Sequence, residues 1–359
     1  MPAPVPSARL LGLATAVPAY ALGQNDIKAW ARKLFNGRTA DIDRLLPAFD
    51  NAGIETRYSC VPLGWHGDGH GWLERNRLYL DNAVELLARA ATECLEAAGL
   101  APADVDAVVA VSTSGFATPS LDALVIERLK LRRDVARLPV FGLGCAGGVV
   151  GLARAAEMAR AVPGRRVLFL VAELCGLTFR DHDSSKSNVI ATVLFGDGAA
   201  AALLATDGGD NGGVTAQAPR LSRAGEHTWP DSLDVMGWNI ADDGFGVLFS
   251  QDIPSLVTRE MPAVLDAYLA VQGLSLSDYD GFVCHPGGAK VVAALEQVFG
   301  LTPGGLEHPR GVLRDYGNMS AATVMFVLRR CIADCRPGRY LMSALGPGFS
   351  VGFLTLDVP

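Results

Sequence analysis

The sequence predicts an α/β fold built from two similar halves, and three observations support this prediction. Short apolar runs that suit buried strands alternate with longer segments that suit helices. A strand with a loop, a glycine turn with a helix, and two closing strands occur in this order twice along the 359 residues. Half of the residues are hydrophobic and 40 are glycine, which suits a well-packed protein with many tight turns. A chain of this length exceeds one ordinary domain, so we expect two domains or one duplicated unit.

The first half contains, in order, a strand that enters a polar loop, a strand with a glycine turn and a helix, an apolar strand, and a further pair of strands (105–115, 140–162, 165–173 and 193–207). Pro163 and Gly164 end the predicted helix. Upstream, residues 73–100 carry apolar side chains at helical spacing and reach their end at Gly99. We expect this segment to be a structural helix in an N-terminal extension, without chemistry of its own.

The second half repeats the order with a strand and loop, a glycine turn and helix, and two closing strands (279–288, 317–335, 338–346 and 351–358). In this overlay, the start of the helix after Cys145 matches the start of the helix after Asn318, and the loop 112–115 matches 285–288. Residues 208–250, which begin with GGDNGG, form a turn-rich connection. We therefore divide the chain into halves at 1–215 and 216–359, whose seam would bring the two helix starts together.

Three side chains beside glycines are candidates for catalysis: Cys145 in GLGCAGG, His285 in CHPGG and Asn318 in YGNMSAATV. A thiol, an imidazole and a carboxamide suit acyl-thioester chemistry, in which a thiolate holds an acyl group while two neutral donors stabilise an enolate. A helix N-terminus lowers the pKa of a thiol, and a nearby imidazole lowers it further. The small residues after Cys145 would let an acyl chain approach.

Each of these residues also has an ordinary structural explanation. Cys145 can be a buried cysteine in a turn, His285 a hydrogen-bonded polar residue after a strand, and Asn318 a helix N-cap. The three motifs together, in this order and spacing, are difficult to explain by packing alone. The combination therefore favours the catalytic interpretation.

Charge and composition argue against several classes of function. The net charge is −7 and no Lys/Arg cluster covers a helix face, so we expect no nucleic-acid binding. The N-terminus lacks a hydrophobic signal core, and no apolar run reaches the roughly 18 residues of a membrane span, so we expect a soluble, cytoplasmic protein. Seven scattered cysteines argue against a disulfide framework, and the six histidines form no zinc-type pattern, so no metal is expected.

Five motifs together resemble those of type III polyketide synthases, the chalcone-synthase family of the thiolase superfamily: GLGCAGG, LFGDGAAA, CHPGG, YGNMSAATV and ALGPGFS. The resemblance covers nearly the whole chain. It implies a thiolase-like fold, with two βαβαβ-type halves in a five-layer αβαβα arrangement, and a homodimer. It further implies an enzyme that loads an acyl-CoA, extends it with malonyl-CoA and releases a cyclised product. CoA thioesters would be its substrates, without a metal or redox cofactor.

The resemblance assigns roles residue by residue. Cys145 matches the nucleophile, while His285 and Asn318 match the pair that assists decarboxylation and stabilises the enolate. Phe195 matches a gatekeeper phenylalanine between a CoA tunnel and the catalytic cavity. The other residues that the resemblance implies for substrate binding are Glu173, Cys175, Thr178, Thr118, Trp238, Val247 and, as a contact to a CoA phosphate, Arg57.

Three departures from the plant members concern the substrate. Val247 stands where plant enzymes have a second gatekeeper phenylalanine, and Trp238 where they have a small glycine that shapes the cavity. Thr118 stands where they have a methionine that reaches into the partner subunit's cavity. The phrases DNAGIETRY (50–58) and HGWLERNRLYL (70–80) resemble bacterial members that make alkylpyrones and alkylresorcinols, so fatty acyl-CoA is the expected starter.

Other functions remain open from the sequence. A ketoacyl-synthase III of fatty-acid synthesis also uses Cys, His and Asn, but typically carries His-Gln-Ala-Asn where this chain has His-Pro-Gly-Gly at 285–288. A Cys/His thioester hydrolase would release free acid without consuming malonyl-CoA. A catalytically inactive paralogue is disfavoured because all three chemical residues are present.

Overall fold

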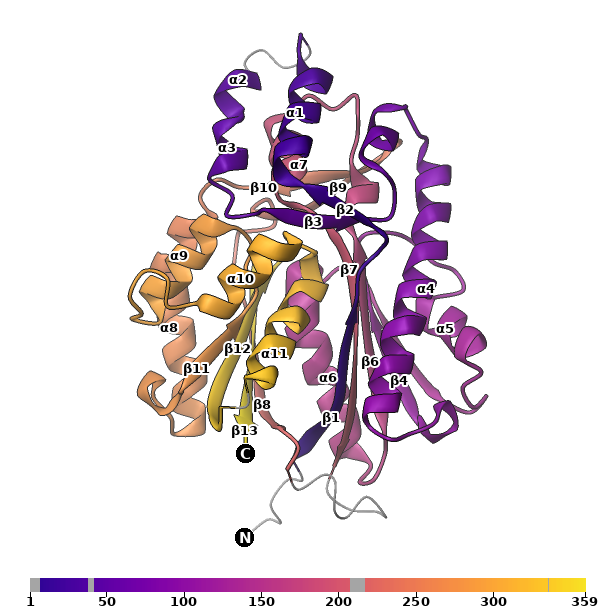
Figure 1. Cartoon of the computed structure of the whole chain (residues 1–359). Helices are drawn as coiled ribbons and strands as arrows, with labels where there is room; N and C mark the ends of the chain where they lie inside the picture. The colour runs from indigo at the N-terminus through magenta and orange to yellow at the C-terminus, as the bar shows by residue number, and fades with distance from the viewer. Residues whose placement is uncertain (1–6, 38–41, 207–216, 335) are drawn as a thin grey trace.

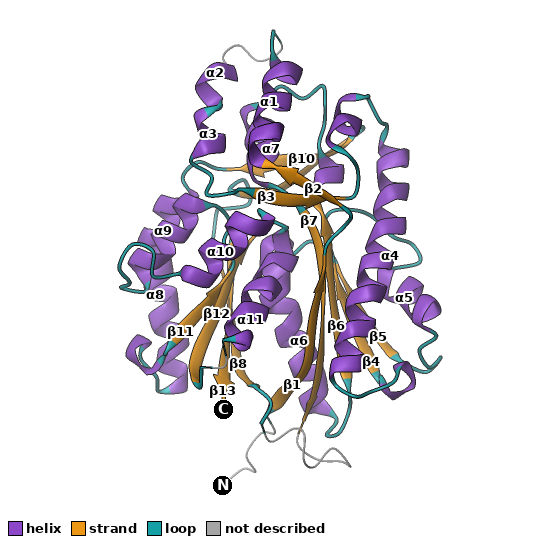
Figure 2. Cartoon of the chain, viewed as in Figure 1, coloured by secondary structure: helices purple, strands orange, loops and turns teal. Residues whose placement is uncertain are grey.

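The computed structural model describes residues 7–37, 42–206, 217–334 and 336–359. A mixed sheet of nine strands runs through the molecule in the order β11-β12-β13-β8-β1-β7-β6-β4-β5, and helices cover it (Figure 2). Two further strand pairs, β2–β3 and β9–β10, lie outside this sheet. The sheet and its helices confirm the predicted α/β class.

The first unit supplies five neighbouring strands: β1 (Ala8–Ala16), β4 (Ala107–Val111), β5 (Ala136–Val140), β6 (Val167–Leu174) and β7 (Asp197–Thr206). β4 runs parallel to β5 and β6, whereas β7 is antiparallel to both β6 and β1. Both faces of β4 are buried, because Val109 and Val111 lie in a central core while Val108 and Ala110 lie in an outer one. Burial on both faces explains why these strands are almost continuously apolar.

The second unit repeats this arrangement with four strands: β8 (Arg220–Thr228), β11 (Gly281–Cys284), β12 (Gly338–Gly346) and β13 (Ser350–Val358). β11 is parallel to β12, and β13 is antiparallel to both β12 and β8. Thus β1, β4, β6 and β7 correspond to β8, β11, β12 and β13. β5 has no such counterpart, because helix α10 (Glu307–Tyr316) precedes the second central helix instead. The duplication predicted from the sequence is confirmed.

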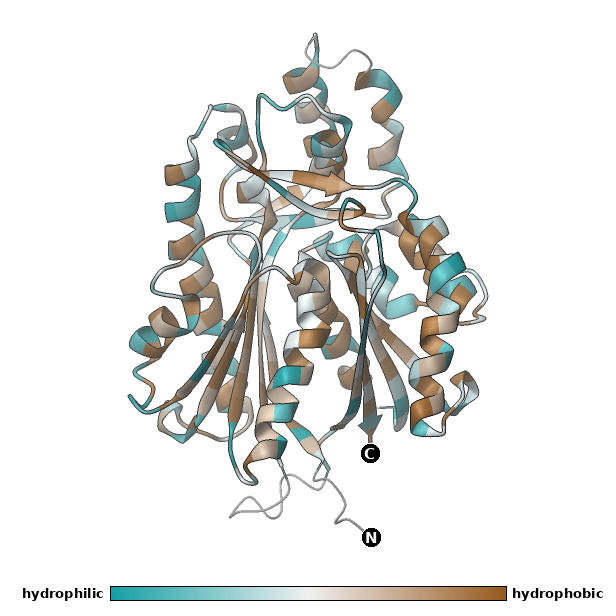
Figure 3. Ribbon diagram, turned by 180° about the vertical axis from the view of Figure 1, so that it is seen from behind, coloured by the Kyte–Doolittle hydropathy of each residue, from teal (hydrophilic) through white to brown (hydrophobic). Residues whose placement is uncertain are grey.

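The helices complete five layers, which can be followed across Figure 1. α6 (Gly147–Ala161) and α11 (Thr323–Ala333) lie between the two half-sheets. α4 (Trp72–Ala97) and α5 (Leu121–Leu129) pack on the outer face of the first half-sheet, and α8 (Ile253–Gln272) and α9 (Ala289–Val298) on that of the second. Figure 3 shows hydrophobic residues along the strands, while the outer helices carry both hydrophobic and hydrophilic residues.

The seam between the units depends more on side-chain packing than on backbone pairing. Only Ala8–Leu221 and Arg9–Arg220 pair β1 with β8 in the described residues. The central helices instead approach closely: a Cβ on Gly148 would lie 2.2 Å from the Ala321 carbonyl oxygen. Glycine is therefore required at position 148 for the two units to pack.

A smaller group of elements covers one end of the sheet, at the top of Figure 1. It consists of α1 (Gln24–Phe35), α2 (Ile42–Leu45), α3 (Pro47–Asp50), α7 (Lys186–Leu194), the strand pair β2 (Tyr20–Gly23) and β3 (Thr56–Ser59), and the hairpin of β9 (Met236–Ala241) and β10 (Gly244–Phe249). Phe195, which follows α7, pairs with Asn318 in an isolated parallel bridge. This bridge joins the covering elements to the second central helix.

Three predictions about elements were wrong. Residues 193–207 contain the end of α7 and the single strand β7 instead of two strands, and α4 corresponds to α8 within the repeated unit instead of belonging to an extension. The predicted connection 208–250 contains β8, β9 and β10. The alternating exposure of β8 explains the miss, since polar residues line its open face. The GGDNGG turn and the predicted boundary at 215/216 lie outside the described residues.

In the part of the chain that the structure describes, no helix is long and apolar enough to cross a membrane.

Candidate active site

Cys145 lies in a short 3₁₀ turn, η3 (Gly144–Ala146), directly before the central helix α6. Gly144 has a φ of +48°, and its backbone N–H donates to the Thr113 hydroxyl at 3.1 Å. The Cys145 thiol donates to the Ser320 hydroxyl in the second unit, with 3.6 Å between Sγ and Oγ. The thiol therefore lies at the seam between the units, as the duplication predicted.

The small residues after Cys145 allow close packing of α6, whereas the sequence predicted that they give an acyl chain access. Ala146, Gly147 and Gly148 are all buried, and a Cβ on Gly147 would lie 2.7 Å from Val111 and 3.2 Å from Ala321. These positions are therefore small because α6 packs against the strand and helix beside it. They do not provide an approach for an acyl chain.

Asn318 is completely buried, and every polar group of its backbone and side chain makes a contact. Its N–H donates to the Leu194 carbonyl, and its own carbonyl accepts from Gly196, both at 2.9 Å. Its side-chain oxygen accepts the Ser320 N–H at 2.8 Å, and its Nδ2 donates to the Gly287 carbonyl at 3.0 Å. Since Nδ2 carries two hydrogens, a second N–H remains, which the Cys145 sulfur or a ligand can accept. Asn318 thus has a local structural role, as the predicted helix N-cap would, and its side chain keeps one donor that this role does not use.

His285 follows β11 and is 5% exposed. Its N–H donates to the Ser343 carbonyl at 2.9 Å, which continues the β11–β12 pairing. Both ring nitrogens are buried and have no hydrogen-bond partner among the described residues. A Cβ on Gly287 would lie 3.7 Å from Nε2, so glycine at this position leaves space beside that nitrogen. A substrate oxygen could therefore occupy the position that a partner would otherwise take.

Burial controls the electrostatics of this site. Burial raises the pKa of the Cys145 thiol to about 12, although hydrogen bonds from Ser320 and Asn318 act in the opposite direction. Burial also lowers the pKa of His285 to about 3. Thiol and imidazole are therefore both neutral near pH 7. The predicted lowering of the thiol pKa was wrong, because desolvation of the thiolate outweighs the hydrogen bonds that favour it.

Glu173, at the end of β6, is a buried carboxyl group close enough to Cys145 to act on its pKa. Its Oε2 accepts the Thr113 N–H at 3.1 Å. Burial raises the pKa of Glu173 to about 7, against the effect of hydrogen bonds from Ser114 and Thr113. The residue belongs to the wall of the site, where the resemblance had placed it.

Trp238 and Val247 lie directly opposite each other in the β9–β10 hairpin. Trp238 donates from Nε1 to the Thr113 carbonyl at 2.9 Å, and Thr113 in turn binds the turn that holds Cys145. The indole ring lies 6.3 Å from the ring of Phe195, measured between centroids. Directly opposite side chains project from the same face of a strand pair, so the bulky and the small residue are neighbours on one face. The hairpin therefore places Trp238 beside the nucleophile's turn.

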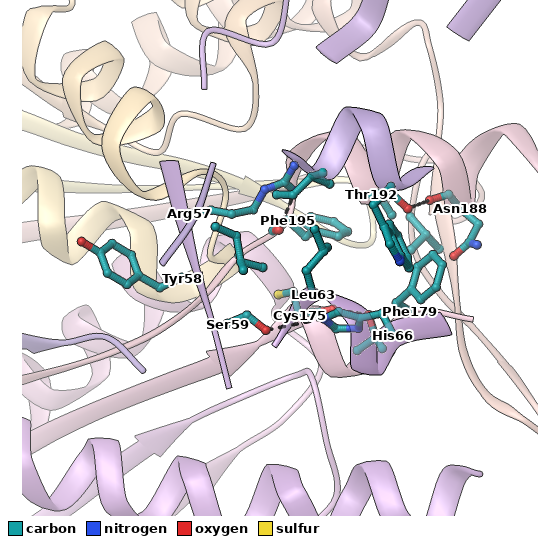
Figure 4. Close-up of a pocket in the computed structure, with 18 residues that line it drawn as sticks. Arg57, Tyr58, Ser59, Leu63, His66, Cys175, Phe179, Asn188, Thr192 and Phe195 are labelled. Carbon is teal, nitrogen blue, oxygen red and sulfur yellow. Dashed lines mark hydrogen bonds between the residues drawn. The ribbon is translucent and has the colours of Figure 1, made fainter. Parts of the chain in front are cut away.

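A pocket lies beside Phe195 (Figure 4). Its cavity volume is about 60 Å³, within about 540 Å³ of empty space that includes open solvent. Its wall is mostly apolar and includes Leu22, Ile27, Trp30, Leu63, Phe179, Phe195 and Val247. Cys175 and Thr178, both predicted to bind substrate, also line it, and the Thr178 hydroxyl donates to the Cys175 carbonyl at 2.7 Å. The predicted site residues are thus distributed between the pocket and the nucleophile's turn.

Of the two remaining predicted residues, one lies outside this pocket and the other lines it. Thr118 is exposed in the loop between β4 and α5 and does not line this pocket. Arg57 lines the pocket with 4% of its surface exposed, and its guanidinium donates to the Phe195 carbonyl and to the Gln24 side chain. Because its guanidinium is almost fully buried and is held by these internal bonds, the predicted contact to a CoA phosphate is not supported by this geometry.

Two further residues of the site, Thr113 and Ser320, were not predicted, although both lie in the motifs described above. Thr113 lies in the loop 112–115 that the overlay matched with the His285 loop, and it contacts Gly144, Glu173 and Trp238. Ser320 follows Asn318 by two positions and has a φ of +46°, an unusual value for a residue with a side chain. In the described residues, no group of three or more His, Cys, Asp or Glu side chains is placed to hold a metal ion.

Comparisons with known families agree with this geometry. The family model of the N-terminal domain of chalcone and stilbene synthases matches residues 69–208, and that of the C-terminal domain matches residues 220–354. Together the two models cover most of the chain.

Individual relatives match over nearly their whole length. A putative chalcone synthase of Bacillus subtilis is 39% identical over 95% of this chain and 96% of its own. A 1,3,6,8-tetrahydroxynaphthalene synthase of Streptomyces peucetius is 36% identical over 95% and 91%. A 3,5-dihydroxyphenylacetyl-CoA synthase of Streptomyces toyocaensis is 32% identical over 98% and 90%.

A solved structure shows the same architecture. The tetrahydroxynaphthalene synthase of Streptomyces coelicolor superposes with a TM-score of 0.89 at 25% identity, covering 98% of this chain and 99% of its own. This likeness confirms the thiolase-like fold that the motifs implied. The chain belongs to the chalcone and stilbene synthase family and is a type III polyketide synthase, an acyl-transferring enzyme that performs decarboxylative Claisen condensation.

Proposed function

We propose that this enzyme loads a fatty acyl-CoA onto Cys145, extends it with malonyl-CoA and releases an alkylpyrone or alkylresorcinol. The observation that carries the choice of starter is the apolar pocket beside Phe195, which Val247 leaves open and which is lined by apolar side chains along much of its wall. Each CH₂ that moves from water into such a pocket contributes about 0.8 kcal/mol. A flexible alkyl chain suits this surface better than a polar starter does.

Loading begins with a neutral thiol and a neutral imidazole. In our proposal, His285 accepts the proton of Cys145 as the thiolate attacks the acyl-CoA carbonyl, because a free thiolate is disfavoured in this buried site. The CoA thiolate leaves and takes the proton from the imidazolium. The acyl group then remains on Cys145 as a thioester, and both side chains are neutral again.

Extension uses the two donors of the second unit. Malonyl-CoA loses CO₂, and the electrons of the broken C–C bond move onto the thioester oxygen. The free N–H of Asn318 and an N–H of His285 would donate to this oxygen. The enolate carbon then attacks the Cys145 thioester, and the thiolate of Cys145 leaves as the new C–C bond forms. Transfer of the longer chain from CoA back to Cys145 allows another round.

CoA thioesters supply all the atoms of this scheme, so we propose that it needs no metal or redox cofactor. We also propose a cytoplasmic homodimer, following the resemblance. The two Streptomyces relatives above are named for a tetrahydroxynaphthalene and a dihydroxyphenylacetyl-CoA, and neither name carries a long alkyl chain. Short or malonyl-derived starters are therefore the alternative to test.

The test is purified protein with malonyl-CoA and straight-chain acyl-CoA starters from acetyl to stearoyl, with the products identified by mass. We expect kcat/KM to rise with chain length until the pocket is full and then to fall. A preference for acetyl-CoA or for malonyl-CoA alone would overturn the proposed starter. Activity only with malonyl-ACP would favour a ketoacyl-synthase III, and release of free acid without use of malonyl-CoA would favour a hydrolase. Cys145→Ala should abolish product in every arm.

A further inference from the structure

The C-terminal end of α7 is held by side chains and backbone from three distant segments. The last carbonyl groups of a helix have no partner within it and must find one elsewhere. Here Gln24 Nε2 donates to the Val193 carbonyl at 3.1 Å, and the Asn318 N–H donates to the Leu194 carbonyl at 2.9 Å. Arg57 Nη1 donates to the Phe195 carbonyl at 2.8 Å. Three consecutive carbonyls thus have three separate donors.

Arg57 and Gln24 also hold each other. Arg57 Nη2 donates to Gln24 Oε1 at 2.5 Å, so the amide oxygen of Gln24 accepts from Arg57 while its nitrogen donates to the helix end. A buried cation at a helix C-terminus interacts favourably with the partial negative charge there. The Asp197 carboxylate supplies a further favourable charge, and it is fixed by N–H donors from Cys60 at 2.9 Å and Gly176 at 2.7 Å.

This helix end is attached directly to Asn318. The Gly196 N–H donates to the Asn318 carbonyl, which completes a two-bond bridge with the Leu194 contact. The stem of Arg57 fills the angle between the two segments: a Cβ on Gly196 would lie 3.2 Å from Arg57 Cβ, and one on Gly317 would lie 3.3 Å from it. A shift of Arg57 must therefore move the backbone on both sides of the bridge.

We propose that Arg57 is a positioning residue that, with Gln24, fixes the carboxamide of Asn318 and the ring of Phe195 relative to Cys145. This inference rests on the proposed function, because it takes Asn318 as a donor to the enolate oxygen. Arg57 touches no reacting atom in this scheme. It acts through the backbone of residues 194–196, and its importance follows from the steep dependence of catalysis on geometry, where a misplacement of about 1 Å can cost about 100-fold in rate.

The test compares Arg57→Met, which keeps the stem and removes the donors, with Arg57→Lys, which keeps the charge and one donor site. Two steps are measured separately: acylation of Cys145 by the starter, followed by intact mass, and decarboxylation of malonyl-CoA. We expect kcat for decarboxylation to fall about 10- to 100-fold in Arg57→Met with little change in KM. The rate of Cys145 acylation should stay within about threefold of the wild-type rate. The kcat of Arg57→Lys for decarboxylation should lie between those of the wild type and Arg57→Met.

Arg160→Met is the matched control, because Arg160 also donates to two backbone carbonyls, those of Leu221 and Ser222, but from the C-terminal end of α6. Arg57→Met could slow acylation and decarboxylation equally, with both losses proportional to its loss of thermal stability, and Arg160→Met could behave in the same way. In that case Arg57 is only structural and the inference is wrong. Unchanged decarboxylation in both Arg57 variants would overturn it as well. A wild-type enzyme that does not decarboxylate malonyl-CoA would instead overturn the proposed function.

Discussion

The partly buried Cys145 and the buried His285 and Glu173 are titratable side chains of one region, and desolvation shifts the pKa of each so that the neutral form is favoured. Charge in this site is therefore costly before a substrate is bound. A carboxylate entering beside these groups would itself be disfavoured, which assists its loss as CO₂. The neutral state of the free site and the decarboxylation that we propose are consistent with each other.

Glu173 gives a prediction about stability and pH. Its pKa is about 7 in the folded protein against an ordinary value of 4.5, so the unfolded chain releases this proton first as pH rises. The folded state then binds more protons, and the free energy of unfolding falls between these two values, by up to about 3 kcal/mol. Glu173→Gln should remove this decrease. Chemical denaturation of both proteins from pH 4.5 to 8 checks it, and identical pH slopes would contradict the assignment.

Asn318 gives a prediction about chemistry. Asn318→Ala should lose most malonyl-CoA decarboxylation, since removal of one such donor typically costs about 2.7–4 kcal/mol of transition-state stabilisation. Cys145 should still be acylated, because loading in our scheme does not require the carboxamide. Rapid-quench measurement of CO₂ release alongside intact mass separates the two steps. Near-normal decarboxylation would remove Asn318 from its role.

The chemistry of this site could be predicted from the sequence better than its electrostatics or its support. Cys145, His285 and Asn318 each stand in a glycine-containing motif, and the duplication supplies the reason for their meeting. The pKa of Cys145 depends on burial by residues far along the chain, which local motifs do not contain. Likewise, Arg57 could be recognised as a cation, but its bond to Phe195 could only be seen in the fold.

At the scale of elements, the β9–β10 hairpin contributes both to the pocket beside Phe195 and to the surroundings of the turn that holds Cys145. Trp238 is bulky and tied to Thr113, and its cross-strand partner Val247 is small and lines the pocket. The sequence indicated both departures separately, but only the strand register shows that they are neighbours on one face.

The hairpin predicts distinct effects for its two positions. Val247→Phe should fill part of the pocket and shift the preferred starter to a shorter acyl-CoA. Loss of room for two CH₂ groups corresponds to about 1.6 kcal/mol, or roughly tenfold in relative kcat/KM for long chains. Trp238→Gly should instead change the number of extensions or the ring closure, because Trp238 faces the nucleophile's turn. The starter series and product masses check both.

Ile240→Ala is a suitable control, since Ile240 is on the same hairpin and 63% exposed. It should alter neither the starter preference nor the product. Equal effects of all three substitutions would mean that the hairpin responds as a whole to any change. In that case the separate roles of Trp238 and Val247 would be wrong.

The close contact of the central helices gives a prediction about stability. Gly148→Ala would place a Cβ 2.2 Å from the Ala321 carbonyl oxygen, a backbone atom that cannot move aside cheaply. We expect a loss of about 1–3 kcal/mol in the free energy of unfolding. Gly64→Ala is the control, because a Cβ there meets no atom within 4 Å. Urea denaturation of the two variants should differ clearly; equal stability would mean that the seam adjusts.

At the scale of the whole molecule, the two-fold repetition of motifs was sufficient to predict the duplicated α/β architecture. It was insufficient to find all members of each unit. β8 was missed because only one of its faces is well covered, and α4 was assigned to an extension because its counterpart α8 shares its position but no motif with it. The correspondence between α4 and α8 follows from their equivalent positions relative to the strands of each unit. It can be recognised only once the order of the strands in the sheet is known.

The free edge of the large sheet gives a prediction about assembly. β5 is its last strand, and Phe141 directly after it stacks on Phe116 with 5.0 Å between centroids, although these rings are 48% and 42% exposed. We expect a second copy of the chain to cover this region, with the Thr118 loop close to it. Sedimentation should give close to twice 37.8 kDa. Phe141→Asp should weaken the dimer, whereas Leu233→Asp, at a residue 81% exposed elsewhere, should not. A monomeric wild type would contradict this expectation.

The absence of a second β5 breaks the symmetry of the duplicated molecule where the chemistry takes place. In the first unit, the segment before the central turn is a strand whose backbone is committed to its own half-sheet. In the second unit, α10 comes first, and Asn318 then pairs with Phe195 of the other unit instead. In a fully symmetric duplication, the turn before each central helix would follow a strand of its own half-sheet, and the two turns would be equivalent. Here the two positions are unequal: one unit carries Cys145 at its central turn, and the other carries Asn318 and His285.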